Sequence, residues 1–143
     1  QIVDAMAARL VRDPENFDVI VTTNMFGDIL SDEASELAGG LGLASSLNYG
    51  TRNAMAQAQH GSAPEIAGQN IANPTALIES IAMLFNWLAV ERNNPKLNEA
   101  ALEIRNGLAN MISDVEARTR DLGGHNSTSG FGCGVAAYLD RQS

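Results

Sequence analysis

Two aspartates, Asp28 and Asp32, are the residues whose types and spacing most directly suggest chemistry in this chain. In a helix, positions i and i+4 face the same side, so the stretch NMFGDILSD places two carboxylates one turn apart. Two oxygen ligands of this kind suit Mg²⁺ or Mn²⁺ better than Zn²⁺. The structural alternative is that acids near a helix N-terminus complement its dipole, which explains Asp28 better than Asp32.

A loop of small residues follows, with the sequence HGSAPEIAG over positions 60–68. Glycine and other small residues let a backbone approach a bound molecule closely. Glu65 is suited to accept hydrogen bonds from both ribose hydroxyls, and its charge would repel a 2′-phosphate, which favours NAD over NADP. The loop is not a G-x-G-x-x-G fingerprint. From these residues alone, an ordinary surface loop with a hydrogen-bonded His60 stays open as the alternative.

The apolar pattern predicts the elements that must position these residues. Residues 17–23 form a β-branched apolar run, typical of a buried parallel strand, and Asn24 is suited to cap the helix that carries both aspartates. Residues 39–43 are rich in glycine and mark a break that suits a domain hinge. The remaining expected elements are a helix over 2–12, extended segments near 46–49 and 54–59, and helices from Pro74 after the capping Asn73, over 97–115 and over 129–141.

The composition is that of a globular protein, with 45% hydrophobic and 18% charged residues. A formal net charge of −8 argues against nucleic acid as the partner of this chain alone. No apolar run approaches the roughly 18–20 residues of a membrane helix, and the first residues lack the basic start of a secretory signal. The single cysteine, Cys133, excludes an internal disulfide, fits a reducing cytoplasm and is expected to be a small buried thiol.

The stretches NMFGDILSDEASELAGGLGLASSLNYG and HGSAPEIAGQNIANPTA closely resemble metal-dependent β-decarboxylating dehydrogenases, the isocitrate/isopropylmalate dehydrogenase family. The similarity runs from about Val3 to Ser143 and corresponds to the C-terminal portion of such an enzyme. It implies an α/β fold, namely the C-terminal part of a two-domain isopropylmalate-dehydrogenase-like fold, rich in helices and with few strands. Residues 1–38 would end the smaller, dimer-forming domain with the metal aspartates, and residues 39–143 would belong to the cofactor-side domain with the adenosine-binding loop.

The resemblance also assigns roles to individual residues. Asp28 and Asp32 match aspartates that bind Mg²⁺ or Mn²⁺, and Asp4 matches a third metal aspartate, which in the dimer reaches the neighbouring subunit's site. Asn73 is expected near the adenine of NAD. The family's NAD-using members have aspartate where this chain has Glu65, so the negative charge is kept on a side chain one methylene longer. The positions that match the loop around the adenosine end of the cofactor are His60, Gly61, Ser62, Ala63, Pro64, Glu65, Ile66, Ala67 and Gly68.

The implied reaction is the oxidative decarboxylation of a 2-hydroxy dicarboxylic or tricarboxylic acid of the isopropylmalate or isocitrate type, with hydride transfer to the nicotinamide. The family's base and acid are a lysine and a tyrosine upstream of the matched stretch, and Lys96, Tyr49 and Tyr138 do not match them. The substrate-binding arginines also lie upstream. No catalytic residue is therefore assigned here, and the chain alone is expected to be inactive.

A homodimer, a small hydroxy-acid substrate and a cytoplasmic location are expected, with neither nucleic acid nor membrane as partner. The alternative is a non-catalytic nucleotide-binding subunit or dimerisation module of such an enzyme. The three aspartates favour the enzyme. The absence of the family's lysine base and of its substrate-binding arginines favours the module.

Overall fold

Two compact units make up the protein in the computed structural model, which describes residues 1–141. The first unit is Gln1–Leu41 and the second begins at Gly42. The division falls within the glycine-rich segment 39–43, where Gly39 and Gly40 have φ angles of 130° and 114°. Such angles are accessible mainly to glycine, so the chain can leave the preceding helix here. The roles expected for residues 1–38 and 39–143 stay a prediction.

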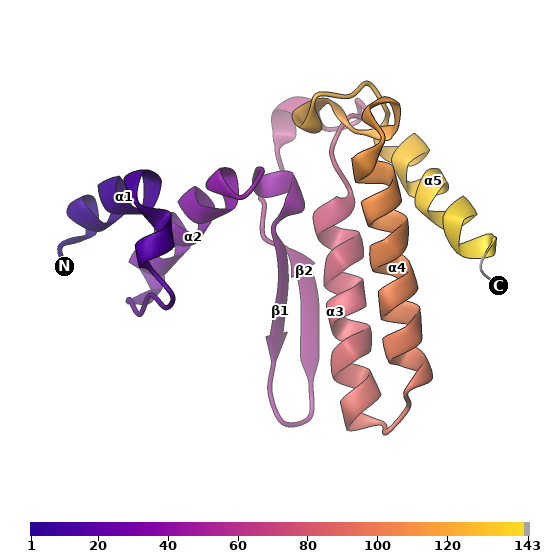
Figure 1. The fold of residues 1–143 in the computed structure, drawn as a ribbon, viewed down its shortest axis with the longest axis horizontal. Helices are drawn as coiled ribbons and strands as arrows, with labels where there is room; N and C mark the ends of the chain where they lie inside the picture. Colours follow the sequence, from indigo (N-terminus) through magenta and orange to yellow (C-terminus); the bar gives the residue numbers. More distant parts are fainter. Residues whose placement is uncertain (142–143) are drawn as a thin grey trace. The chain divides into compact units, whose positions relative to one another are not determined.

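The first unit consists of two helices, α1 (Val3–Arg12) and α2 (Asn24–Leu37), with a 3₁₀ turn at Pro14–Asn16 between them (Figure 1). Its core is small and comprises Met6, Leu10 and Leu30, with Val3, Ala7, Phe17 and Ala34 packed against it. The Arg9 guanidinium lies 4.9 Å from the centre of the Phe17 ring, a cation–π contact that extends this core. Because α1 covers only part of α2, several apolar side chains of α2 stay exposed, among them Met25, Ile29 and Leu37.

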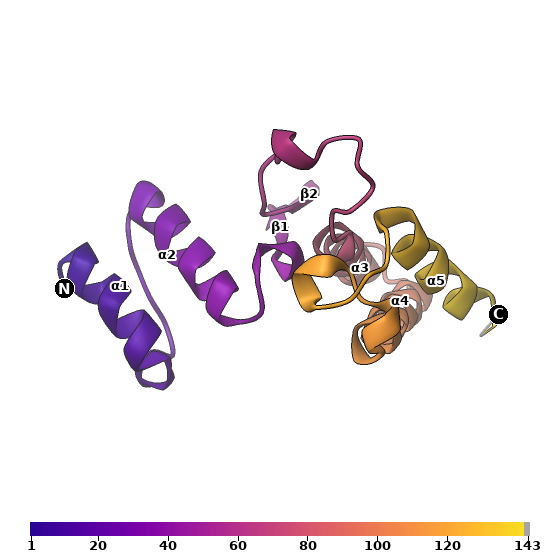
Figure 2. The same cartoon turned by 90° about the horizontal axis from the view of Figure 1, so that it is seen from above.

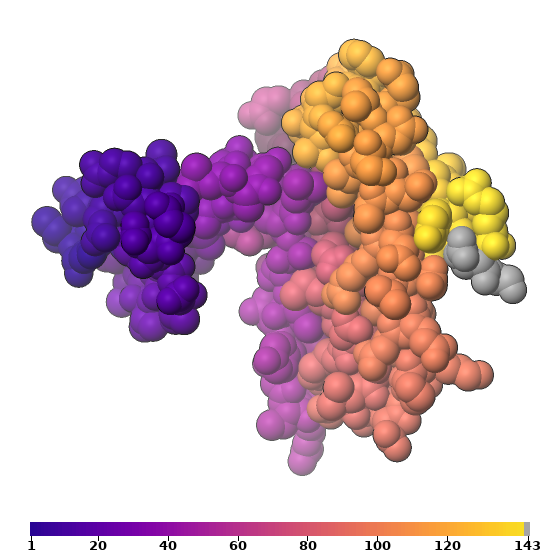
Figure 3. Space-filling view, in the orientation of Figure 1, coloured from indigo at the N-terminus to yellow at the C-terminus, as the bar shows by residue number. Residues whose placement is uncertain are grey.

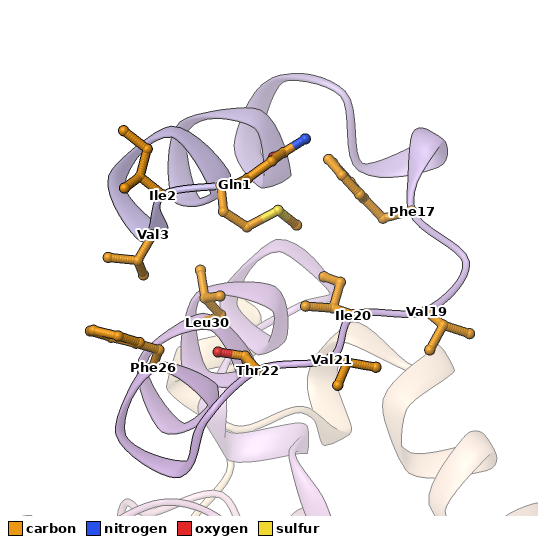
Figure 4. Close-up of a pocket in the computed structure, with 11 residues that line it drawn as sticks. Gln1, Ile2, Val3, Phe17, Val19, Ile20, Val21, Thr22, Phe26 and Leu30 are labelled. Atoms are coloured by element: carbon orange, nitrogen blue, oxygen red, sulfur yellow. The ribbon is translucent and has the colours of Figure 1, made fainter.

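The strand predicted over residues 17–23 is wrong, because this segment pairs with no strand in the described residues. Its side chains do alternate: Ile20 points toward Leu30, whereas Val19 and Val21 are 81% and 92% exposed (Figure 4). A strand needs a neighbouring backbone for its N–H and C=O groups. Both strands of residues 1–141 pair with each other, so the 17–23 segment remains unpaired.

An apolar cavity of about 440 Å³ lies between this segment and the two helices (Figure 4). Its lining includes Met6, Phe17, Phe26 and Leu30. No acidic, basic or histidine side chain lines it. Gln1 and Thr22 are the two polar side chains of its lining, so most of the lining side chains are apolar.

The second unit begins with a β-hairpin whose strands match the extended segments expected near 46–49 and 54–59. Strands β1 (Ser45–Tyr49) and β2 (Ala54–Ala58) are antiparallel, with Ser45 opposite Ala58 and Tyr49 opposite Ala54. Helix α3 (Thr75–Glu91) packs against both strands (Figures 1 and 2).

Helix α4 (Lys96–Ser113) packs along α3, and α5 (Thr128–Asp140) packs against α4 (Figure 2). The core between these helices contains Leu108, Met111, Phe131 and Val135. On the same pair of helices, Arg105 of α4 donates to Glu79 at 2.8 Å and to Asn86 at 2.7 Å, both on α3.

Three local expectations in this unit need correction. Helix α4 ends at Ser113 rather than 115, because Asp114 has extended backbone angles and its carboxylate accepts the Glu116 N–H at 3.0 Å. Helix α3 begins at Thr75, one residue after Pro74. Cys133 is exposed rather than buried, since α5 presents it on the side away from Phe131 and Val135. None of the helices in residues 1–141 is both long and apolar enough to cross a membrane.

Candidate metal and nucleotide-binding sites

Asp28 and Asp32 form a polar stripe on α2 together with Ser31 and Ser35. Both aspartates are exposed, and their i, i+4 spacing places them on one side of the helix. The side-chain amide of Asn24 donates to Asp28 Oδ2 at 3.2 Å. Asn24 was expected to cap α2, but it is the first residue of the helix. Thr23 holds the cap position instead, and its side chain makes no capping hydrogen bond. The structure thus brings two of the three expected metal ligands together.

Asp4 lies in the first turn of α1, where its Oδ1 accepts the N–H of Ala5 at 2.7 Å. The described residues contain no group of three or more acidic, histidine or cysteine side chains that could hold a metal ion. Asp4 is therefore not gathered with Asp28 and Asp32 within one chain. Its expected contribution to a neighbouring subunit's site stays a prediction.

The loop over residues 60–68 runs along the surface between β2 and α3. His60 to Glu65 are exposed, and the His60 ring Nδ1 lies 3.0 Å from the carbonyl oxygen of Gly61. Ala63 adopts φ 41° and ψ 63°, a left-handed conformation that is strained for a residue with a side chain. Strained backbone of this kind is common at ligand-binding sites, so the turn at Ala63 is a candidate for ligand binding.

Glu65 sits in a 3₁₀ turn, Pro64–Ile66, that follows the strained alanine. Its backbone carbonyl accepts the side-chain amide of Gln69 at 2.7 Å, which fixes the turn. Its carboxylate, by contrast, has no hydrogen-bond partner among residues 1–141. Both carboxylate oxygens are therefore available to a ligand.

Asn73 is the one expected nucleotide contact that is buried, with 8% of its surface exposed. Its Oδ1 accepts the backbone N–H of Thr75 at 2.9 Å at the start of α3. Its Nδ2 donates to Asp121 Oδ2 at 2.9 Å. The second carboxylate oxygen of Asp121 accepts the hydroxyl of Thr119, which is fully buried.

A second set of contacts holds the far end of the loop to the start of α5. The side-chain amide of Asn70 donates to the Ser129 hydroxyl at 2.8 Å, and its Oδ1 accepts the Ser129 N–H at 3.0 Å. The Thr128 hydroxyl donates to the carbonyl of Ala72 at 2.6 Å. The segment between α4 and α5 gathers at one end of α4, beside this loop (Figures 1 and 3). The C-terminal part of the chain therefore anchors residues 70–73.

Sequence reasoning missed these anchoring residues: Asn70, Thr119, Asp121 and Ser129. The contacts join positions 48 and 59 residues apart, which no local pattern reports. The available signal was the concentration of Asp, Asn, Ser and Thr over 114–129, since these side chains commonly bond to turns and helix starts.

The family model described as isocitrate/isopropylmalate dehydrogenase matches residues 1–135. This chain belongs to the isocitrate/isopropylmalate dehydrogenase family. The resemblance noted in the sequence is thereby confirmed.

Three relatives illustrate the match. Homoisocitrate dehydrogenase of Methanocaldococcus jannaschii is 48% identical over 141 residues, which is 99% of this chain and 38% of that protein. Isocitrate dehydrogenase [NAD] catalytic subunit 6, mitochondrial, of Arabidopsis thaliana is 43% identical over 139 residues, or 96% of this chain and 35% of that protein. The crystal structure of isocitrate dehydrogenase from Methylococcus capsulatus is similar with a TM-score of 0.83 at 40% identity, covering 96% of this chain and 40% of the other.

The predicted fold class is confirmed by the structural match: this family member is helix-rich α/β and corresponds to part of a larger dehydrogenase fold. The chain spans well under half the length of each of these relatives. The structure locates all the expected site residues: Asp4, Asp28, Asp32, the loop at 60–68 and Asn73.

Proposed function

We propose that this chain is part of an oxidoreductase that uses NAD and Mg²⁺ or Mn²⁺ to decarboxylate a 2-hydroxy dicarboxylic or tricarboxylic acid oxidatively, of the isopropylmalate or isocitrate type. The observation that carries the proposal is the exposed loop at 60–68 leading into the anchored Asn73, in a family member that also presents Asp28 and Asp32 one helical turn apart. The name of the Arabidopsis relative includes NAD, which supports this cofactor.

Asp28 and Asp32 are the proposed ligands of the divalent ion, and Asp4 is proposed to complete the site of a second copy. Carboxylate oxygens are the donors that Mg²⁺ and Mn²⁺ prefer. The ion, when bound, would supply positive charge where negative charge develops on the substrate oxygen. The Asn24 amide orients the Asp28 carboxylate, as groups behind a metal ligand commonly do.

The loop at 60–68 is the proposed contact for the adenosine half of NAD. Its small residues leave the backbone accessible, and the unpartnered carboxylate of Glu65 can accept two hydrogen bonds from one ribose. A 2′-phosphate beside this carboxylate would meet like-charge repulsion, so NAD is the proposed cofactor rather than NADP.

The proton transfers are assigned to residues that do not belong to this chain. Its only lysine, Lys96, begins α4, while Tyr49 lies on β1 and Tyr138 on α5. None of the three matches the base or acid expected from the family resemblance. The alternative function, a non-catalytic nucleotide-binding subunit or dimerisation module, keeps the loop and the aspartates but needs no base or acid.

A homodimer through α1 and α2 is part of the proposal. The apolar residues that these helices leave exposed include Ile2, Val11, Met25 and Ile29. A second copy would cover such a face and bring Asp4 toward the partner's α2.

The deciding experiment is an intact-mass measurement on the protein purified from its natural source, followed by a turnover assay with NAD, Mn²⁺ and a panel of 2-hydroxy acids. A mass well above 15.1 kDa with NAD-linked release of CO₂ would support the enzyme. A mass near 15.1 kDa without turnover would favour the subunit or module. The absence of any nucleotide binding would refute the enzyme and the nucleotide-binding subunit.

A further inference from the structure

We draw no further inference here: the strongest candidate, the apolar cavity between the unpaired segment 17–23 and the helices α1 and α2, carries nothing because nothing in the described residues shows what covers it.

Discussion

The fully buried hydroxyl of Ser80 accepts the backbone N–H of Ser46 at 3.0 Å and so ties α3 to strand β1. The same oxygen lies 2.8 Å from the carbonyl of Gln57 on β2 and 2.7 Å from that of Ala76. One small side chain thus connects α3 to both strands of the hairpin.

Ser80→Ala should lower the free energy of unfolding by about 1–3 kcal/mol, because it leaves the Ser46 N–H without its partner in a buried place. Urea unfolding followed by circular dichroism measures this. Ser113→Ala is the control, since the exposed Ser113 hydroxyl only bonds to the Asn110 carbonyl and its loss should cost under about 0.5 kcal/mol. Equal effects of the two changes would contradict the role given to Ser80.

Thr75→Val should stabilise the protein by about 1 kcal/mol. The Thr75 hydroxyl is buried, and within the described part of the chain it has no hydrogen-bond partner. Folding therefore removes the water that solvates this hydroxyl and supplies no hydrogen bond in its place. Valine has nearly the same shape and lacks the hydroxyl. Thr119→Val, which removes a bonded hydroxyl, should instead destabilise. A lower melting temperature for Thr75→Val would show that its hydroxyl is satisfied in solution.

If Asp28 is a ligand of the proposed metal site, Asp28→Asn should weaken Mn²⁺ binding by at least about tenfold, because it removes a charged oxygen from α2. Electron paramagnetic resonance of free Mn²⁺ during a titration gives the affinity. Asp18→Asn makes the same charge change at an exposed residue outside the helix and should have no effect. Unchanged binding in Asp28→Asn would remove this residue from the metal site.

Glu65→Lys should shift the cofactor preference from NAD toward NADP by an order of magnitude or more, since repulsion of the 2′-phosphate becomes attraction. The ratio of the dissociation constants of the two cofactors, from isothermal titration calorimetry, is the measurement. Glu99→Lys changes net charge equally from an exposed position on α4 and should leave the ratio as it was. If both variants behave alike, Glu65 is not next to the ribose.

Ile29→Glu should convert the proposed dimer toward monomer, because Ile29 is 55% exposed on α2 and a buried unpaired charge is costly. Light scattering after size-exclusion chromatography reports the molar mass. Val90→Glu places a charge on the similarly exposed Val90 of α3 and should not change the mass. A dimer that survives Ile29→Glu would place the interface elsewhere.

Much of the local structure follows from the sequence. The period of apolar residues located α1, α4 and α5 to within about two residues, since such a stripe is a property of one helix alone. The two strands of the hairpin were also located, because a short turn between alternating segments lets neighbours in sequence pair. The long motifs around Asp28 and His60 identified the family, which the comparisons confirmed.

Only the tertiary structure decided what depends on distant partners. Residues 17–23 have the apolar pattern of a strand, yet they form none, because pairing requires a neighbouring strand that residues 1–141 do not offer. The bond from Asn73 to Asp121 likewise depends on how α3 and α4 pack, since it joins residues 48 apart. Periodicity is local and can be counted along a chain, whereas strand pairing and side-chain anchoring are set by contacts that form only when distant segments meet.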